Sequence, residues 1–375
     1  MKSATLTIVV LFLAGEVSLA FGQGKPYWQA EWEKTVEAAK KEGQVTVYTS
    51  PVPLPAMDYF ARAYPEIKVI KVGGRGGSQL QRVIAERRAG KYVADVFTAG
   101  ITETVPLYNA KMLSPLKPLL LLPEVTDESK WWEKRHRYGD PEGRYVFVYL
   151  GVPQPGSIYC NTNLVNPKEI KSLWDLLHPK WKGKILVRDP RVQGPGGGTL
   201  RFFYHHPQVG PEYLRRLFGE MDVTLTRDFR QGTDWLARGK FALCLGCGDV
   251  NQARAQGLPV DKLGILKEGA GLVAQGGTLA FMDKAPHPNA GRLFINWLLS
   301  REGQTAVQQG NALQKSGVPD SLRTDIPKDD IPADERRVEG VTYFDMEKPE
   351  WLDMRPIYKI ADEALEEAKK KQKEK

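Results

Sequence analysis

The stretch VGGRGGSQLQRVIAERRAGKYVADVFTAG, from Val72 to Gly100, decides the fold of this 375-residue chain. It contains the end of an expected strand, a glycine-rich loop, an amphipathic helix and a second expected strand. Ser78 is the expected N-cap of the helix, and Gly90 is its expected stop. The stretch therefore predicts one βαβ unit.

The loop of this unit has the composition of an anion-binding site. Gly73, Gly74, Gly76 and Gly77 leave the backbone open to close approach. Backbone N–H groups at the start of a helix attract negative charge, and Arg75 adds a full positive charge beside them. A glycine-rich turn before a helix also serves plain chain reversal, so the loop alone leaves both interpretations open.

A second glycine-rich turn, GPGGGT at residues 194–199, repeats this design. It follows an expected strand that ends in Arg188 and precedes an apolar and aromatic helix. Gly197, Gly198 and Thr199 are therefore candidate ligand contacts. Two such loops in two α/β halves, facing each other across a cleft, favour the binding of a small anion or carboxylate.

Strands and helices alternate along the whole chain, which predicts an α/β architecture with ligands outside the carboxyl ends of the strands. An amphipathic helix with Trp28, Trp32, Val36 and Ala39 at helical spacing is expected to end at Gly43. Strands are expected at 44–49, 67–72, 93–98, 145–150, 157–161, 185–187, 223–226, 241–245 and 278–281.

The N-terminus has the pattern of a signal peptide spanning residues 1–20. Lys2 precedes an apolar run from Leu6 to Ala14, and Ser18-Leu19-Ala20 has the small-x-small pattern of a cleavage site. We therefore expect an exported, periplasmic protein. The formal net charge is +8, but Lys and Arg are scattered among acidic residues, so nucleic acid is not an expected partner.

No sequence pattern of a catalytic site or cofactor site stands out. The chain has no H-E-x-x-H, no Walker loop, no nucleophile elbow, and no G-x-G-x-x-G with its downstream acid, so an enzyme is disfavoured and no cofactor is expected. Cys244 and Cys247 leave three interpretations open: buried thiols, a structural disulfide, or a functional motif. His205 and His206 are adjacent and are expected at the surface.

Several segments resemble the extracellular solute-binding proteins of ABC transporters, of the ferric-binding-protein type. The similarity in order and spacing extends from about residue 25 to 315. The segments that carry it are EWEKTVEAAKKEGQVTVYTS (31–50), AERRAGKYVADVF (85–97), YCNT (159–162), WKGK (181–184), HPNA (287–290), NWLLS (296–300) and EGQ (302–304).

The resemblance implies a two-lobed periplasmic-binding-protein fold of type 2, with hinged lobes that each have a central mixed sheet flanked by helices. Lobe 1 is expected to comprise residues 24–155 plus 270–315, and lobe 2 residues 156–269 plus 316–375. The hinge is expected to include the strand near residues 157–161.

The resemblance also places the ligand loops. They fall at Ser50, at Arg75 to Ser78, at Ala99-Gly100, at Gly197 to Thr199, and at Asp249 to Asn251. Iron-binding members carry an adjacent Tyr pair at the last of these loops, where this chain reads Gly248-Asp249-Val250-Asn251, and no adjacent Tyr pair occurs anywhere in the sequence. Hard Fe(III) needs anionic oxygen ligands, so the sequence favours a small anion and predicts no bound metal.

The expected function is that of a periplasmic substrate-binding subunit that delivers a small anionic solute to an inner-membrane ABC permease, as a monomer. One alternative is an iron(III) or iron-chelate binder of the same family. An alternative from another class is a periplasmic enzyme or sensor domain on the same scaffold, because a fold does not fix a function.

Overall fold

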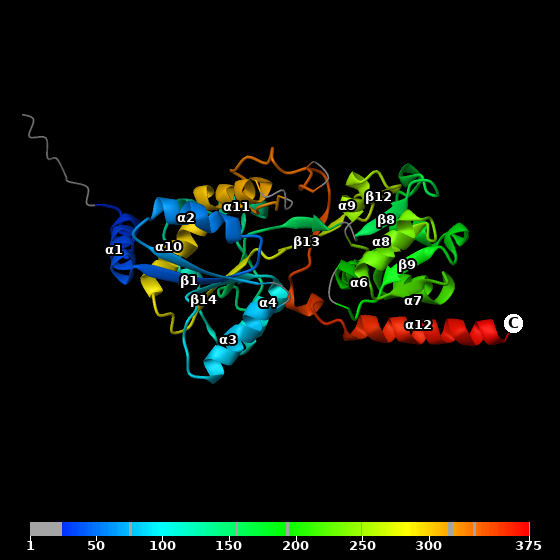
Figure 1. Cartoon of the computed structure of the whole chain (residues 1–375), viewed down its shortest axis with the longest axis horizontal. Helices are drawn as coiled ribbons and strands as arrows, with labels where there is room; N and C mark the ends of the chain where they lie inside the picture. Colours follow the sequence, from blue (N-terminus) through cyan, green and yellow to red (C-terminus); the bar gives the residue numbers. More distant parts are fainter. Residues whose placement is uncertain are drawn as a thin grey trace, which may run out of the picture.

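The computed structural model describes residues 25–74, 77–154, 157–192, 195–248, 250–313, 318–332 and 335–374. Within these residues the chain forms two α/β lobes with a small sheet between them (Figure 1). The expected signal peptide lies outside the described residues. The same holds for three residues of the expected site, Arg75, Gly76 and Asp249. No helix in the described part of the chain is long and apolar enough to cross a membrane.

The first lobe is built on a seven-stranded mixed sheet. Its strands are, in spatial order, β2 (Lys68–Gly73), β1 (Gln44–Thr49), β3 (Val96–Ala99), β14 (Thr278–Met282), β6 (Val146–Val148) and β5 (Arg137–Tyr138), with β4 (Leu113–Ser114) paired to β14. β1 runs parallel to β2 and β3, whereas β14 runs antiparallel to β3 and β6. The carboxyl ends of the three parallel strands therefore meet at one edge of the sheet.

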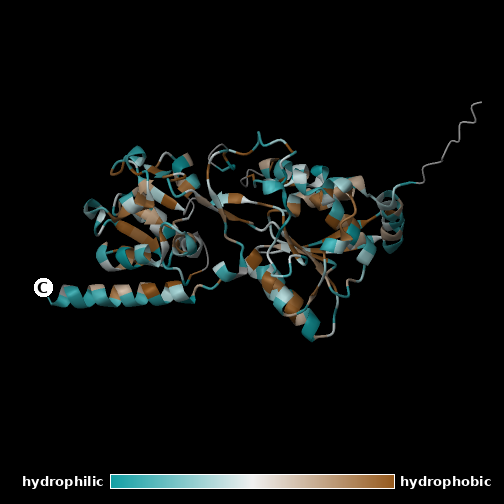
Figure 2. Cartoon of the chain, turned by 180° about the vertical axis from the view of Figure 1, so that it is seen from behind, coloured by the Kyte–Doolittle hydropathy of each residue, from teal (hydrophilic) through white to brown (hydrophobic). Residues whose placement is uncertain are grey.

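Helices cover both faces of this sheet. They are α1 (Tyr27–Glu42), α2 (Met57–Ala63), α3 (Ser78–Arg88), α4 (Ile101–Asn109), α5 (Pro123–Thr126), α10 (Pro288–Leu299) and α11 (Arg301–Leu313). Phe60 packs edge-on against Phe294 and Trp297, with ring centroids 5.1 and 5.2 Å apart. Hydrophobic residues, coloured brown in Figure 2, accordingly concentrate on the strands and on the inner sides of the helices.

The second lobe is built on a five-stranded sheet with the spatial order β10 (Thr224–Thr226), β9 (Ile185–Arg188), β11 (Leu243–Leu245), β8 (Ile158–Asn161) and β12 (Val260–Lys262). Its helices are α6 (Pro195–His205), α7 (Gly210–Glu220), α8 (Phe229–Ala237), α9 (Val250–Ala255) and α12 (Arg355–Lys373). Ile357, Ile360, Ala361 and Ala364 of α12 belong to the core of this lobe, which keeps the long C-terminal helix on its surface (Figure 1).

Three short strands form the sheet between the lobes, with the order β15 (Tyr343–Asp345), β13 (Ala270–Val273) and β7 (Val152–Gln154). In chain order, β7 precedes β8 of the second lobe, and β13 precedes β14 of the first lobe. The expected hinge strand β8 itself belongs to the five-stranded sheet. Of the expected C-terminal remainder, Leu322 packs in the core of the first lobe and Ile357 in that of the second, and the lobe boundaries stay a prediction.

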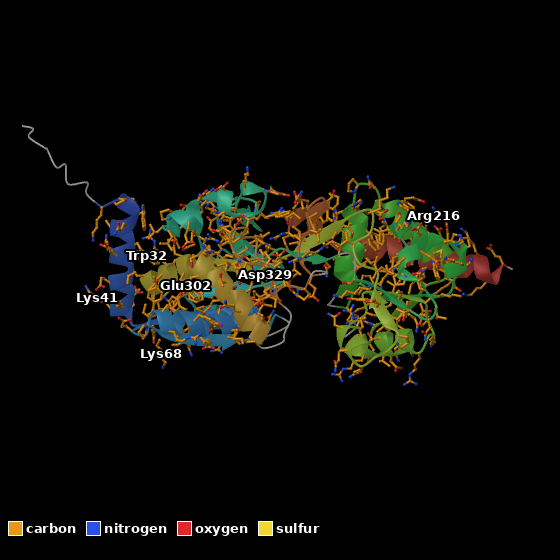
Figure 3. All side chains as sticks on the ribbon, turned by 90° about the horizontal axis from the view of Figure 1, so that it is seen from above. Trp32, Lys41, Lys68, Arg216, Glu302 and Asp329 are labelled. Carbon is orange, nitrogen blue, oxygen red and sulfur yellow. A yellow bond between two sulfur atoms is a disulfide. The ribbon has the colours of Figure 1, made fainter. Side chains whose placement is uncertain are left out.

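Short 3-10 turns complete the described chain. They are η1 (Leu54–Ala56), η2 (Lys117–Leu119), η3 (Glu128–Lys130), η4 (Trp132–Lys134), η5 (Pro167–Glu169), η6 (Leu173–Leu177), η7 (Pro179–Trp181) and η8 (Pro349–Trp351). α1, which carries Trp32 and Lys41, lies at one end of the molecule, and Arg216 of α7 lies towards the other (Figure 3).

Two local predictions of helix ends have different outcomes. The predicted stop of the first helix is confirmed, because Gly43 is left-handed with φ 68° and its N–H donates to the Ala39 carbonyl at 3.0 Å. The predicted cap at Ser78 is wrong. Ser78 is the first residue of α3, and Gly77, with φ 79°, takes the cap position, so the chain turns into the helix one residue earlier than expected.

Candidate functional site

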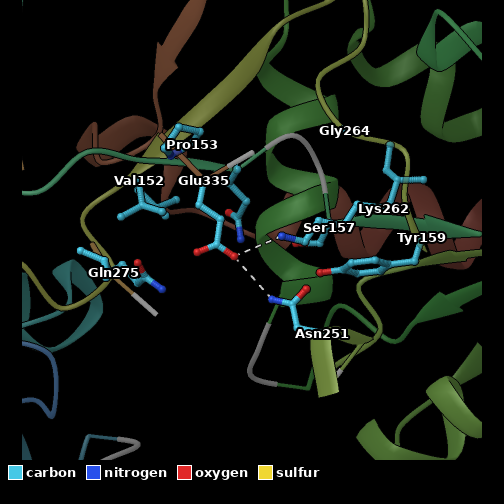
Figure 4. Close-up of a pocket in the computed structure, with 13 residues that line it drawn as sticks. Val152, Pro153, Ser157, Tyr159, Asn251, Lys262, Gly264, Gln275 and Glu335 are labelled. Atoms are coloured by element: carbon cyan, nitrogen blue, oxygen red, sulfur yellow. Dashed lines mark hydrogen bonds and ion pairs between the residues drawn. The ribbon is translucent and has the colours of Figure 1, made fainter. Parts of the chain in front are cut away.

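A cavity of about 250 Å³ opens between the lobes, beside the sheet that links them (Figure 4). The linking strands contribute Val152, Pro153, Gln154 and Val273 to its lining. Polar side chains on the remaining walls come from both lobes and from the segment after α11: Ser157, Tyr159, Asn251, Lys262, Gln275 and Glu335. Because the hinge strands form its floor, a rotation of one lobe against the other changes the shape of this cavity.

The second lobe presents a phenol and an ammonium group side by side. Tyr159 of β8 and Lys262 of β12 are directly paired in the antiparallel register of these strands, so their side chains share one face of the sheet. Burial raises the pKa of Tyr159, although the nearby Lys262 opposes this shift. The Tyr159 hydroxyl therefore stays protonated and serves as a hydrogen-bond donor near a positive charge.

Glu335 reaches these groups from the segment after α11. Its Oε1 lies 3.2 Å from Lys262 Nζ and 3.5 Å from Asn251 Nδ2 (Figure 4). The side chains of Lys262 and Glu335 are 20% and 27% exposed. The pocket thus holds a partly solvated ion pair, and a carboxylate already lies against the groups that would receive an anion.

The structure brings the expected first-lobe residues to one edge of the seven-stranded sheet. The Ser50 N–H donates to the Thr98 carbonyl at 2.8 Å, and the Gly74 N–H donates to the Thr49 carbonyl at 3.2 Å. The Ser50 hydroxyl contacts the Gly276 carbonyl at 3.3 Å. Ser50 is thereby held beside Gln275, which lines the cavity, while Ser50 itself does not line it.

The other expected first-lobe residues follow from the same sheet edge. Gly77 and Ser78 begin α3 after β2, and Gly100 precedes α4 directly after β3. The buried Gln79, which the sequence did not single out, donates from Nε2 to the Thr49 carbonyl at 2.5 Å and fixes the start of α3 to the end of β1. None of these residues lines the cavity, and their role as ligand contacts stays a prediction.

The second expected glycine loop is the first turn of α6. Gly197 and Gly198 are half-buried, and Thr199 is fully buried. A Cβ placed on Gly198 would lie 3.0 Å from Gln154 Oε1. Since Gln154 lines the cavity, the start of α6 lies directly behind its wall.

Asn251 is the expected ligand residue that the structure places in the cavity itself. It is the second residue of α9, and its side chain contacts Glu335. The further polar residues, Lys262, Gln275, Gln154 and Glu335, were not predicted as site residues. They lie on short strands or in loops, where no periodic pattern marks them.

The cysteines and histidines resolve two further predictions. Cys244 and Cys247 form a disulfide, with Cα atoms 5.9 Å apart, and Cys160 is a buried free thiol.

The predicted surface position of His206 is wrong, because its ring is buried and contacts the Glu268 carbonyl at 2.8 Å. His205 stacks on Trp351, with ring centroids 4.8 Å apart. Among the described residues, no group of three or more His, Cys, Asp or Glu side chains is placed to hold a metal ion.

Comparison with known proteins gives a family and several structural likenesses. The chain matches the bacterial extracellular solute-binding protein family over residues 20–305. A Haemophilus influenzae protein without an assigned function is 25% identical over 297 residues, which span 74% of this chain and 79% of the relative.

Two solved structures show the same fold at low identity. The periplasmic binding protein AfuA from Actinobacillus pleuropneumoniae, solved with exogenous fructose 6-phosphate bound, is 19% identical with a TM-score of 0.56, over 87% of this chain and 99% of that one. A Bordetella ferric binding protein is 19% identical with a TM-score of 0.58, over 87% of this chain and 98% of that one. These likenesses establish the fold as that of type 2 periplasmic binding proteins.

Proposed function

This chain belongs to the bacterial extracellular solute-binding proteins, and we propose that it is the periplasmic substrate-binding subunit of an ABC importer for a small anionic solute. The observation that carries this proposal is the cavity between the lobes, where Lys262, Asn251 and the protonated Tyr159 converge. An ammonium group and two neutral donors match the charge and hydrogen-bonding needs of a carboxylate or phosphate.

The position of the cavity supports transport by lobe closure. A solute that contacts both lobes stabilises the arrangement in which they are close together, and so shifts the equilibrium at the hinge towards a closed form. A membrane permease can recognise that form by its shape. This function needs no chemistry on the solute.

Two observations favour an anion over iron(III). Fe(III) needs several anionic oxygen ligands, whereas the described lining of the cavity offers one carboxylate, Glu335, and one phenol, Tyr159. That carboxylate is already ion-paired with Lys262 at 3.2 Å, so an iron(III) ion would have to compete with an ammonium group for it. The AfuA structure, solved with fructose 6-phosphate, makes a sugar phosphate a suitable first compound to test.

Binding of this class of solute is tested on protein purified from the periplasm. Native mass spectrometry identifies any co-purified ligand, and titration calorimetry measures binding of inorganic phosphate, citrate and fructose 6-phosphate. Scattering with the bound compound is expected to give a smaller radius of gyration. A co-purified neutral or cationic solute, with no binding of any of these anions, contradicts the proposal.

Lys262→Met removes the positive charge from the pocket. A charge-assisted hydrogen bond contributes about 1.5 to 3 kcal/mol, so the affinity for the anion is expected to fall roughly tenfold to a hundredfold. Lys267→Met is the matched control, because Lys267 is exposed and lies outside the cavity lining. Equal affinities of the two variants would place the anion elsewhere.

A further inference from the structure

Glu335 comes from a segment that is attached to the first lobe, yet its carboxylate contacts the second. Leu150 and Ser321 form a β-bridge beside the seven-stranded sheet, and Leu322 packs in the core of that lobe. Further along the chain, Glu335 contacts Lys262 and Asn251. These two residues lie on β12 and α9 of the second lobe. The contact therefore bridges the cleft.

A buried anchor fixes the backbone two residues beyond Glu335. The Arg337 N–H donates to Asp320 Oδ2 at 2.9 Å, and its guanidinium donates to the carbonyls of Ser321 at 2.6 Å and Gly151 at 3.2 Å. Asp320 is 1% exposed. The segment is thus held firmly on the first-lobe side, and Glu335 extends from that anchor into the cavity.

Glu335 contacts Lys262 and Asn251, and the proposed function makes the same two side chains the binding groups for the solute. Its carboxylate has the charge and acceptor geometry of an anionic ligand group, and it lies in the cavity against Lys262 and Asn251 (Figure 4). An incoming carboxylate or phosphate at the same place would meet a like charge. Both anions cannot share Lys262 without a cost.

We propose that Glu335 is a built-in carboxylate that occupies the solute pocket of the empty protein, ties the first lobe to the second through Lys262 and Asn251, and is displaced by the arriving anion. The displacement rests on the proposed function, whereas the tie between the lobes does not. Such a residue sets the affinity and the selectivity of the pocket, because weak anions fail to displace it.

The tie is tested without any ligand. Glu335→Gln keeps the shape of the side chain and removes its charge, and Glu339→Gln is the matched control on an exposed glutamate of the same segment. Small-angle scattering of the ligand-free proteins is expected to show a larger radius of gyration for Glu335→Gln than for the wild type and Glu339→Gln. High salt should move the wild type towards the variant, because it screens a partly exposed pair. Equal radii in all three proteins overturn the tie.

The displacement is tested by calorimetry with inorganic phosphate, citrate and fructose 6-phosphate. Glu335→Gln is expected to bind the anion about two- to fivefold more tightly than the wild type, since partly exposed ion pairs contribute modestly. Glu339→Gln should match the wild type. Equal or weaker binding by Glu335→Gln overturns the displacement. If none of the anions binds to the wild type or to Glu335→Gln, the proposed function and the displacement fail together, and the scattering result alone decides the tie.

Discussion

At the scale of single residues, two glycines bring the predicted ligand segments of the second lobe together. Gly246 follows β11 with φ 80°, and Gly196 lies in the first turn of α6. A Cβ on Gly246 would lie 2.7 Å from the Gly196 nitrogen and 3.3 Å from Arg188 Cβ. The close packing of these backbones therefore requires glycine at 246 for both conformation and space.

Gly246→Ala is expected to lower the free energy of unfolding by about 2 to 5 kcal/mol. The left-handed conformation costs a non-glycine residue about 1 to 2 kcal/mol, and a forced contact with backbone adds about 1 to 3 kcal/mol. Gly257→Ala is the control, because Gly257 has φ 78° and a Cβ there meets nothing within 4 Å. Urea denaturation of both variants separates the two effects, and equal losses would mean that the contact with Gly196 contributes nothing.

At the scale of elements, the disulfide shapes the connection from β11 to α9. Cys244 lies in β11, and Cys247 lies three residues before the start of α9 at Val250. Both cysteines are buried. The Thr233 hydroxyl of α8 donates to the Gly248 carbonyl just beyond the bridge. The disulfide therefore holds the turn that leads to Asn251.

Cys244→Ala with Cys247→Ala is expected to lower the free energy of unfolding by about 2 kcal/mol, the size that chain-entropy arguments give for so short a loop. Anion affinity should also fall, since the turn before Asn251 loses its constraint. A thiol reductant should lower the free energy of unfolding of the wild type to the value of the double variant. It should leave the free energy of unfolding of the double variant unchanged. A reductant effect that persists in the double variant contradicts this assignment.

The apolar strands could be predicted from the sequence, and the short strands with proline, glycine or charged residues could not. The pattern at residues 44–49 matches β1, and the sites of β9, β11 and β14 were also predicted, because each is an apolar run that forms a buried central strand. β7, β12, β13 and β15 have three or four residues and contain Pro153, Gly271 or charged side chains. Their pairing depends on partners far along the chain, such as Gly271 with Gln154, which no local pattern reveals.

At the scale of the whole molecule, the candidate site depends on segments that only the tertiary fold brings together. Tyr159, Lys262 and Glu335 are separated by 70 residues or more and face one cavity. The family resemblance predicted Asn251 as a ligand contact, and the structure places this residue in the lining of the cavity. The positions of Lys262 and Glu335 follow from a short edge strand and from a buried Arg337 anchor, and neither feature has a sequence signature.

The same junction of the lobes holds a buried carboxyl group. Glu347 follows β15, and its Oε1 accepts from the Ala274 N–H at 2.6 Å. Burial raises the pKa of Glu347 to about 7, and the backbone hydrogen bond and Arg201 oppose this shift only in part. Arg201 belongs to α6 of the second lobe and Glu103, which also acts on Glu347, to α4 of the first. The charge of Glu347 therefore interacts with a charged residue of each lobe, Arg201 in the second and Glu103 in the first.

This raised pKa predicts that the contribution of Glu347 to stability falls as the pH rises through neutrality. In the unfolded chain Glu347 ionises near its ordinary pKa of 4.5, whereas in the folded chain it stays protonated to about pH 7. The stabilisation is thus fully present below pH 4.5 and is lost as the pH rises through 7, with a total of up to about 3 kcal/mol. Glu347→Gln keeps the acceptor for the Ala274 N–H and cannot ionise. The free energy of unfolding of the wild type, measured relative to this variant, should therefore fall between pH 5 and pH 8. Denaturation across that range, with Glu339→Gln as the control that should follow the wild type, measures the difference. Parallel profiles for Glu347→Gln and the wild type would show that Glu347 does not titrate with folding.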